Sequence, residues 1–220
     1  MKTINTYITE KLSISKNQKP KYTLFPKTKD ELRVMIEIAM EENGNECSLN
    51  HIDVSKMTNF QWLFNDNKTL ENFDGDISEW DVSNVEDMSY MFAECNITFK
   101  NTDLSGWNVS KCKNMAWMFE DIQFDPNSEY NYDLSEWDMS NVDCINGMFY
   151  DSNFNSDSIC KWDVSNITKM YKTFARSKFN QDISRWDVSN LRDYGLIFAG
   201  AGIEHNGKYW PKELRLKFFQ

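Results

Sequence analysis

Carboxylate side chains recur at two fixed places in this sequence, and such columns could bind cations or a partner. One set lies four residues before a repeated Trp, and the other directly follows the Trp position. The first set is Asp76, Asp103, Asp133 and Asp182, and the second is Asp53, Asp81, Asp138, Asp163 and Asp187. Carboxylates stacked ~5 Å apart repel one another, so each needs backbone donors or a cation. We predict that the second column accepts N–H groups of turns and helix starts, with calcium bridging as the alternative.

Other reactive side chains are scattered. The five Cys occupy different places in the repeating unit, no CxxC pair occurs, and the two His, His51 and His205, are far apart. Zinc-ligand spacing, a glycine-rich phosphate loop and a nucleophile elbow are all missing from the sequence. Catalysis needs one asymmetric group of side chains, whereas these polar residues recur in every unit. We therefore expect no enzyme, no cofactor and no metal, and thiols that are buried in a reducing compartment.

Charge and hydropathy narrow the classes of partner. The net charge of −10 and the absence of a basic cluster argue against nucleic acid, whose phosphates require cations. No run approaches the ~18 apolar residues of a membrane span. The first residues lack the apolar core and the cleavage site of a secretory signal. The sequence thus predicts an intracellular or virion-associated protein whose partner is another protein.

An internal repeat organises most of the chain. Six copies are centred on Ile52, Trp80, Trp107, Trp137, Trp162 and Trp186, in steps of 28, 27, 30, 25 and 24 residues. Every copy has a Ser three residues after the Trp position and a Phe twelve residues after it. Such periodicity is the mark of a solenoid, in which each unit buries its apolar face against its neighbours.

Each copy has two halves with different spacing. The first half is short, with an apolar residue such as Ile183 flanked by polar ones, which is typical of a strand. In the second half, Val85, Met88 and Phe92 lie at helical spacing behind a Ser83–Glu86 capping pattern. We predict an α/β solenoid of about six coils, each a short strand plus a short helix, with a parallel sheet and the Trp rings in the core.

The ends differ from the repeats. Residues 1–48 should form an N-terminal tether, over residues 1–19, and a helical cap that starts at Thr28 and ends near Asn43-Gly44. The solenoid should cover residues 49–200. Residues 201–220 should form a C-terminal cap with a short helix after Pro211.

The repeated unit, seen in Ile77-Ser78-Glu79-Trp80-Asp81-Val82-Ser83-Asn84-Val85, resembles that of the BspA-like leucine-rich-repeat surface proteins. It is similar in particular to a Trp-rich variant of mycoplasma lipoproteins. The resemblance covers residues 49–200 and implies a leucine-rich-repeat-like stack with roles in surface display, adhesion and partner binding. Trp in place of the usual Leu, and the missing Asn ladder, depart from the ordinary leucine-rich-repeat pattern and leave the curvature open.

These features together predict a non-enzymatic protein-binding solenoid that uses the outer face of its parallel sheet. The predicted contacts are the first acidic column, its serines and two tyrosines of an inserted loop: Asp76, Asp103, Asp133, Asp182, Ser105, Ser135, Tyr130 and Tyr132. Insertions in repeat arrays often lie on the binding face. The alternative is a structural component of a virion or surface layer that makes contact through its ends, including Phe218 and Phe219. The oligomeric state is left open.

Overall fold

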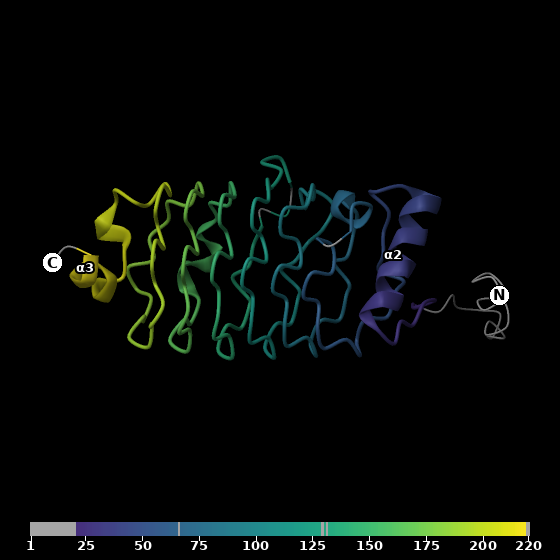
Figure 1. Cartoon of the computed structure of the whole chain (residues 1–220), viewed down its shortest axis with the longest axis horizontal. Helices are drawn as coiled ribbons and strands as arrows, with labels where there is room; N and C mark the ends of the chain where they lie inside the picture. The colour runs from purple at the N-terminus through teal and green to yellow at the C-terminus, as the bar shows by residue number, and fades with distance from the viewer. Residues whose placement is uncertain (1–20, 66, 129, 131, 219–220) are drawn as a thin grey trace.

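The computed structural model describes residues 21–65, 67–128, 130 and 132–218. Between two terminal helices, the chain winds through successive coils that are stacked along the long axis of the molecule (Figure 1). Helix α2 (Lys29–Asn43) covers the N-terminal end, and helix α3 (Lys212–Phe218) lies at the C-terminal end. The predicted tether over residues 1–19 and the predicted contact at Phe219 lie outside the described residues, and so does the side chain of Phe218.

Helix α2 begins and ends as its capping residues predict. The Thr28 hydroxyl accepts the N–H of Glu31, and Gly44 closes the helix with a φ of 83°, a conformation that suits glycine. Leu32, Ile36, Ala39 and Met40 are buried along one face of the helix. This amphipathic face is the reason that the helix packs on the first coil.

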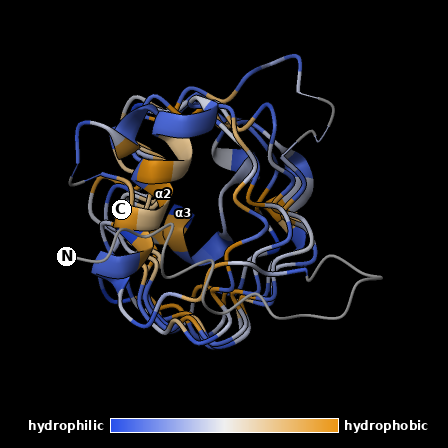
Figure 2. Ribbon diagram, turned by 90° about the vertical axis from the view of Figure 1, so that its right-hand side faces the viewer, coloured by the Kyte–Doolittle hydropathy of each residue, from blue (hydrophilic) through white to orange (hydrophobic). Residues whose placement is uncertain are grey.

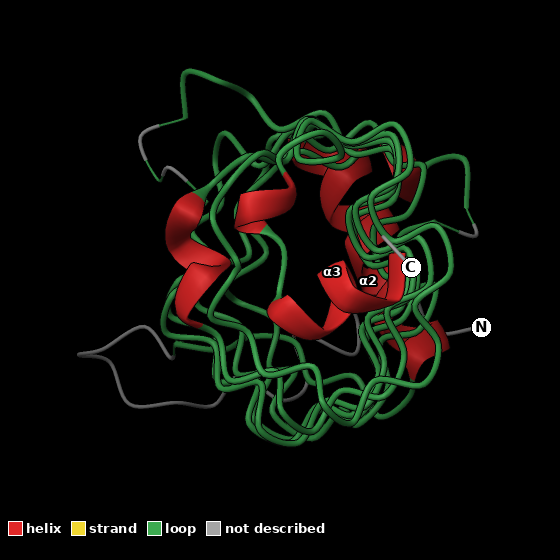
Figure 3. Ribbon diagram, turned by 90° about the vertical axis from the view of Figure 1, so that its left-hand side faces the viewer, coloured by secondary structure: helices red, strands yellow, loops and turns green. Residues whose placement is uncertain are grey.

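The predicted α/β solenoid, with a leucine-rich-repeat-like parallel sheet and one short helix per coil, is wrong. Figure 3 colours no part of the described chain as strand, and the only β-type pairs there are seven isolated parallel bridges. Besides α2 and α3, the helical segments in the described part of the chain are three short 3₁₀ turns: η1 (Leu70–Asn72), η2 (Asp157–Lys161) and η3 (Gly207–Tyr209). Turns and extended connections make up the coils.

Backbone bonds between coils explain why the second half of each repeat is not helical. In the second coil the N–H groups of Met88, Tyr90 and Phe92 donate to carbonyl oxygens of the next coil, at 2.9, 2.8 and 3.2 Å. The intervening N–H groups of Met91 and Ala93 donate three residues back along their own coil. Because no N–H is left for an i−4 carbonyl, a chain of tight turns replaces the helix.

These turns require left-handed backbone at fixed places. Tyr90 and Glu94 have φ values of 57° and 56°, and Trp117 and Asp121 repeat them at 59° and 57° in the next coil. An isolated side chain in this region is uncommon. Here the coil-to-coil bonds on both sides hold it there.

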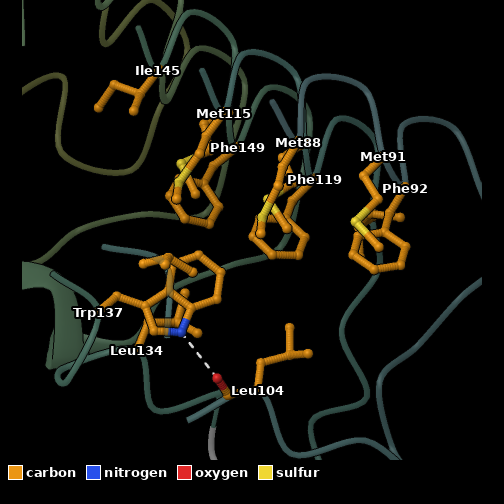
Figure 4. Packing of buried hydrophobic residues seen from close by; sticks show 14 of the residues in the cluster. Met88, Met91, Phe92, Leu104, Met115, Phe119, Leu134, Trp137, Ile145 and Phe149 are labelled. Carbon is orange, nitrogen blue, oxygen red and sulfur yellow. Dashed lines mark hydrogen bonds between the residues drawn. The ribbon is translucent and has the colours of Figure 1, made fainter. Parts of the chain in front are cut away.

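The first half of each coil is bonded through the Trp side chains. Each indole N–H donates to the backbone carbonyl of the apolar residue in the preceding coil, as Trp137 does to Leu104 at 2.9 Å (Figure 4). The same bond recurs from Trp80, Trp107, Trp162 and Trp186. All five rings are at least 95% buried, as predicted. The Trp therefore packs the core and bonds adjacent coils.

The core consists of columns of like side chains. Successive rings of the repeated Phe, from Phe64 to Phe198, lie with centroids 5.2 to 6.1 Å apart. Nearly all of the buried residues are apolar, and Figure 2 shows apolar and polar stretches following one another around the stacked coils. The resulting buried cluster runs continuously from Leu32 to Leu214. Stacking thus buries apolar surface that a lone coil would expose.

The backbone hydrogen bonds of the segment equivalent to residues 88–94 run in one direction from coil to coil. At the N-terminal end, cationic side chains of α2 donate to the carbonyl groups that are left over. In this segment the N–H groups point to the following coil, so the same segment of the first coil is left with outward-facing carbonyl oxygens. Lys29 donates to the carbonyl of Gln61 at 2.6 Å, and Arg33 donates to those of Trp62 and Leu63. At the other end, Trp210 packs against Phe198 with ring centroids 4.7 Å apart.

Candidate functional site

The acidic residues that follow each Trp are bonded within turns. In every copy the side-chain oxygen accepts the N–H of the Ser two residues later, for example Asp138 from Ser140 at 3.0 Å. Asn108, which interrupts the column, makes the same bond to Ser110 at 3.1 Å. Hydrogen bonds from the hydroxyl and the N–H of that Ser lower the pKa of Asp138, Asp163 and Asp187. The prediction that this column accepts turn N–H groups is confirmed, although no helix starts there.

The first acidic column, which we predicted as a partner contact, uses its carboxylates in the same way. Asp103 accepts the N–H of Ser105, and Asp133 that of Ser135, both at 2.9 Å. The same turns are closed by Asp76 and Asp182. No group of three or more possible metal-ligating residues occurs among the described residues. The column is partly accessible to solvent, but each carboxylate already accepts a hydrogen bond within its own turn.

The two predicted loop tyrosines differ in environment. The ring of Tyr132 packs against Phe124, with centroids 4.6 Å apart, and its hydroxyl donates to the carbonyl of Asp125. Burial raises the pKa of Tyr132 to about 12. Tyr130 is half-buried, and its N–H donates to Ser128 at 3.4 Å. Tyr132 therefore holds the loop against the coils.

An open groove of about 670 Å³ lies beside this loop. Three predicted contacts, Tyr132, Asp133 and Ser135, line it together with Lys161 and Gln181. Phe124 and Phe154 of the core also line it. The structure thus brings these three predicted residues to one hollow, whereas Asp76, Asp103, Asp182 and Ser105 do not line it.

A row of half-buried aromatic side chains, missed by the sequence analysis, crosses successive coils. We call Trp62, Tyr90, Trp117, Tyr150 and Tyr171 the aromatic band. Trp62 and Tyr90 stack with centroids 3.9 Å apart and planes 6° apart, and Tyr90 stacks on Trp117 at 6.2 Å. Trp117 meets Tyr150 edge to face at 5.6 Å. The sequence did contain a signal for this band, because the first three copies carry an aromatic residue ten positions after the Trp position.

Cations border the band at its C-terminal part. The ammonium of Lys172 lies 5.4 Å from the ring centre of Tyr150 and 5.3 Å from that of Tyr171. The guanidinium of Arg176 lies 5.7 Å from the Tyr150 ring and pairs with Asp151 at 2.8 Å. Such cation–π contacts hold the cations over the faces of the rings.

A carboxylate beside the band titrates near neutrality. Burial raises the pKa of Glu120 to about 7, and the nearby charges of Glu94 and Asp121 act in the same direction. Glu120 also raises the pKa of Tyr90, after the larger effect of burial. The charge next to the aromatic rings therefore changes within the physiological pH range.

The cysteines show no activated thiol. All five are unpaired, and burial raises the pKa of Cys95 and Cys112 to about 12 and that of Cys160 to about 11. The nucleophilic thiolate form is therefore scarce at neutral pH.

These features define a repeat protein with a row of aromatic side chains at its surface. Its coils are stacked and are joined by the Trp-to-carbonyl hydrogen bonds. The chain belongs to a family described as "Mycoplasma protein of unknown function, DUF285", whose model matches residues 32–125 and again 121–211. The searches of curated proteins and of solved structures gave no significant match. In the part of the chain that the structure describes, no helix has the length and apolarity needed to span a bilayer.

Proposed function

We propose that this chain is a non-enzymatic module that binds another protein through its aromatic band. The observation that carries the proposal is the row of half-buried Trp and Tyr rings on successive coils, bordered by Lys172 and Arg176. Tyr, Trp and Arg are the residues enriched where protein interfaces gain most of their affinity.

The rings are also preorganised for binding. Trp62, Tyr90 and Trp117 are held by stacking on one another, and their backbones are bonded to the adjacent coil. A contact surface that is already ordered loses little conformational entropy on association.

A binding role without catalysis also agrees with the chemistry of the other side chains. The thiols have raised pKa values, and the acidic columns repeat along the coils without forming one distinct constellation. We further propose that the family is related to the BspA-like surface proteins, whose association with adhesion and partner binding supports the same role.

The test compares two surfaces of the same protein. Tagged wild type, a Tyr90→Ala/Trp117→Ala variant and an Asp103→Lys/Asp133→Lys variant are used to capture proteins from host lysate. A protein that is captured by wild type and by the Asp variant, but lost from the aromatic variant, is then purified. Titration calorimetry should show binding that is weakened at least ~100-fold by the aromatic changes.

A partner that is lost from the Asp variant but retained by the aromatic variant would instead indicate that the binding site is the first acidic column. Circular dichroism of both variants is the control for folding, because the aromatic residues are half-buried. Equal binding by all three proteins would contradict both surfaces.

A further inference from the structure

We propose that this protein associates head to tail with a second copy of itself. The outer face of α2 in one copy would dock on the C-terminal coil and α3 of the next copy. Binding through the aromatic band does not depend on this contact, since the band lies along the coils and the docking faces lie at the ends.

Large apolar side chains of the described residues are exposed at the two ends. Among the described residues, the large hydrophobic side chains that are mostly open to solvent are Phe25, Val34, Leu196 and Leu216, with exposures of 59, 45, 52 and 56%. Phe25 and Val34 lie beside and on α2, whereas Leu196 lies in the last coil and Leu216 on α3. Figures 2 and 3 view these two ends. Each end thus has apolar surface to bury.

The two terminal helices carry opposite net charge. Helix α2 has five acidic and two basic residues, and its two cations, Lys29 and Arg33, donate inward to the first coil. Helix α3 has three basic residues and one acidic residue. More widely, residues 169–217 hold ten Lys and Arg against five Asp and Glu, in a chain of net charge −10. This complementarity favours contact between unlike ends and opposes contact between like ends.

The C-terminal end also has an exposed hydrogen-bond donor. In the last coil the N–H of Gly200 donates to Glu204 at 3.0 Å. The N–H of Leu196, a residue that is 52% exposed, has no acceptor within the described ranges. The exposed carboxylates Glu41 and Glu42 of α2 are acceptors of the required kind.

Unlike faces that meet without a two-fold axis form a heterologous interface, which can continue into an open chain of copies. The expected product is therefore a set of oligomers that grows with concentration. Salt should weaken it, because the charges at the ends are exposed and can be screened.

The experiment uses sedimentation velocity of the full chain over a wide concentration range at low and high salt. One variant, Phe25→Gln/Val34→Gln, disables the N-terminal face. A second, Leu196→Asn/Leu216→Gln, disables the C-terminal face, with Asn chosen because it tolerates the left-handed φ of 56° at Leu196. Each variant alone should associate at least ~10-fold more weakly than wild type.

Mixing the two variants gives the decisive result. Each retains the face that the other lacks, so the mixture should form a 1:1 complex that neither protein forms alone. Wild type that is monomeric at all concentrations would overturn the proposal, and so would oligomers that survive in both variants. The Tyr90→Ala/Trp117→Ala protein is the control, and it should associate like wild type while losing its band partner.

Discussion

The indole N–H of Trp137 donates to the carbonyl oxygen of Leu104, 2.9 Å away in the preceding coil (Figure 4). The same oxygen accepts the backbone N–H of Trp107 at 3.1 Å. One carbonyl therefore closes a turn in its own coil and bonds to the ring of the next. This double use explains why five of the six copies carry a Trp at a position where another large apolar side chain, such as Ile52 in the first copy, could fill the space.

Trp137→Phe should lower the free energy of unfolding by about 1–2 kcal/mol, since it removes one hydrogen bond and part of the ring volume while Leu104 keeps its other donor. Trp137→Ala should cost about 3–5 kcal/mol. Urea denaturation measures both. The control is Trp117→Phe in the half-exposed aromatic band, which should cost about 0.5 kcal/mol. Equal losses at Trp117 and Trp137 would contradict the bonding role.

Gly147→Ala should destabilise the fold by about 2–4 kcal/mol, because it adds steric overlap to a left-handed backbone. A Cβ there would lie 2.1 Å from the Trp117 ring, at a φ of 58°. Thermal unfolding is the measurement. Gly106→Ala, where no atom lies within 4 Å of the new Cβ, is the matched control. Addition of Trp117→Ala should recover part of the loss at Gly147, and failure to recover would place the strain elsewhere.

Glu120→Gln should increase stability at pH 8 but not at pH 4. The folded pKa of about 7 lies above the ordinary value of 4.5, so the folded state holds a proton that the unfolded state releases. Stability should therefore be full below pH 4.5, fall between pH 4.5 and 7, and stay lower above pH 7. After allowance for solvent screening, the gain at pH 8 should be about 1 kcal/mol. The measurement is denaturation of wild type and variant across this pH range. If the free energy of unfolding of the variant depended on pH as steeply as that of wild type, the assignment of this pKa to Glu120 would be refuted.

The aspartates of the two columns should lower the stability of the protein as the pH falls, whereas Glu120 lowers it as the pH rises. Hydrogen bonds from serines lower the pKa of Asp133, Asp138 and Asp163 below 3.8. Their contribution to stability is present above pH 3.8 and is lost as the pH falls through the lower folded values.

The double variant Asp138→Asn/Asp163→Asn should show a shallower loss of stability between pH 4 and 2 than wild type. An amide oxygen can accept the same turn N–H without titrating, as Asn108 does from Ser110. Asp138→Ala/Asp163→Ala, which removes the acceptor, is the contrasting variant and should be less stable already at pH 7. Both are followed by circular dichroism during acid titration.

Much of the organisation could be predicted from residue spacing alone. The six-copy repeat, the burial of the five Trp and the limits of α2 follow from periodic apolar residues and from local caps such as Thr28 and Gly44. The turn-closing role of Asp138 and its counterparts was also predictable, because such a carboxylate needs only the N–H two residues along.

The predicted strand and helix failed for a shared reason. Val85, Met88 and Phe92 have helical spacing, but the same spacing suits a chain of tight turns. The choice between them depends on where Met88 and Tyr90 donate their N–H groups, and the acceptors are in the next coil. The aromatic band was missed for the same reason, because the predicted helix would have placed Tyr90 on a solvated face.

The sequence by itself determined the number of coils, the residues that fill their core and the turns at each Asp, because these depend on contacts repeated at short range. Only the tertiary structure decided the conformation within a coil, the stacking of Trp62 on Tyr90 and the contrast between the two ends. These features depend on hydrogen bonds and ring contacts between residues about 25 to 30 positions apart, in which the preferences of one segment are overridden by the neighbour that it meets.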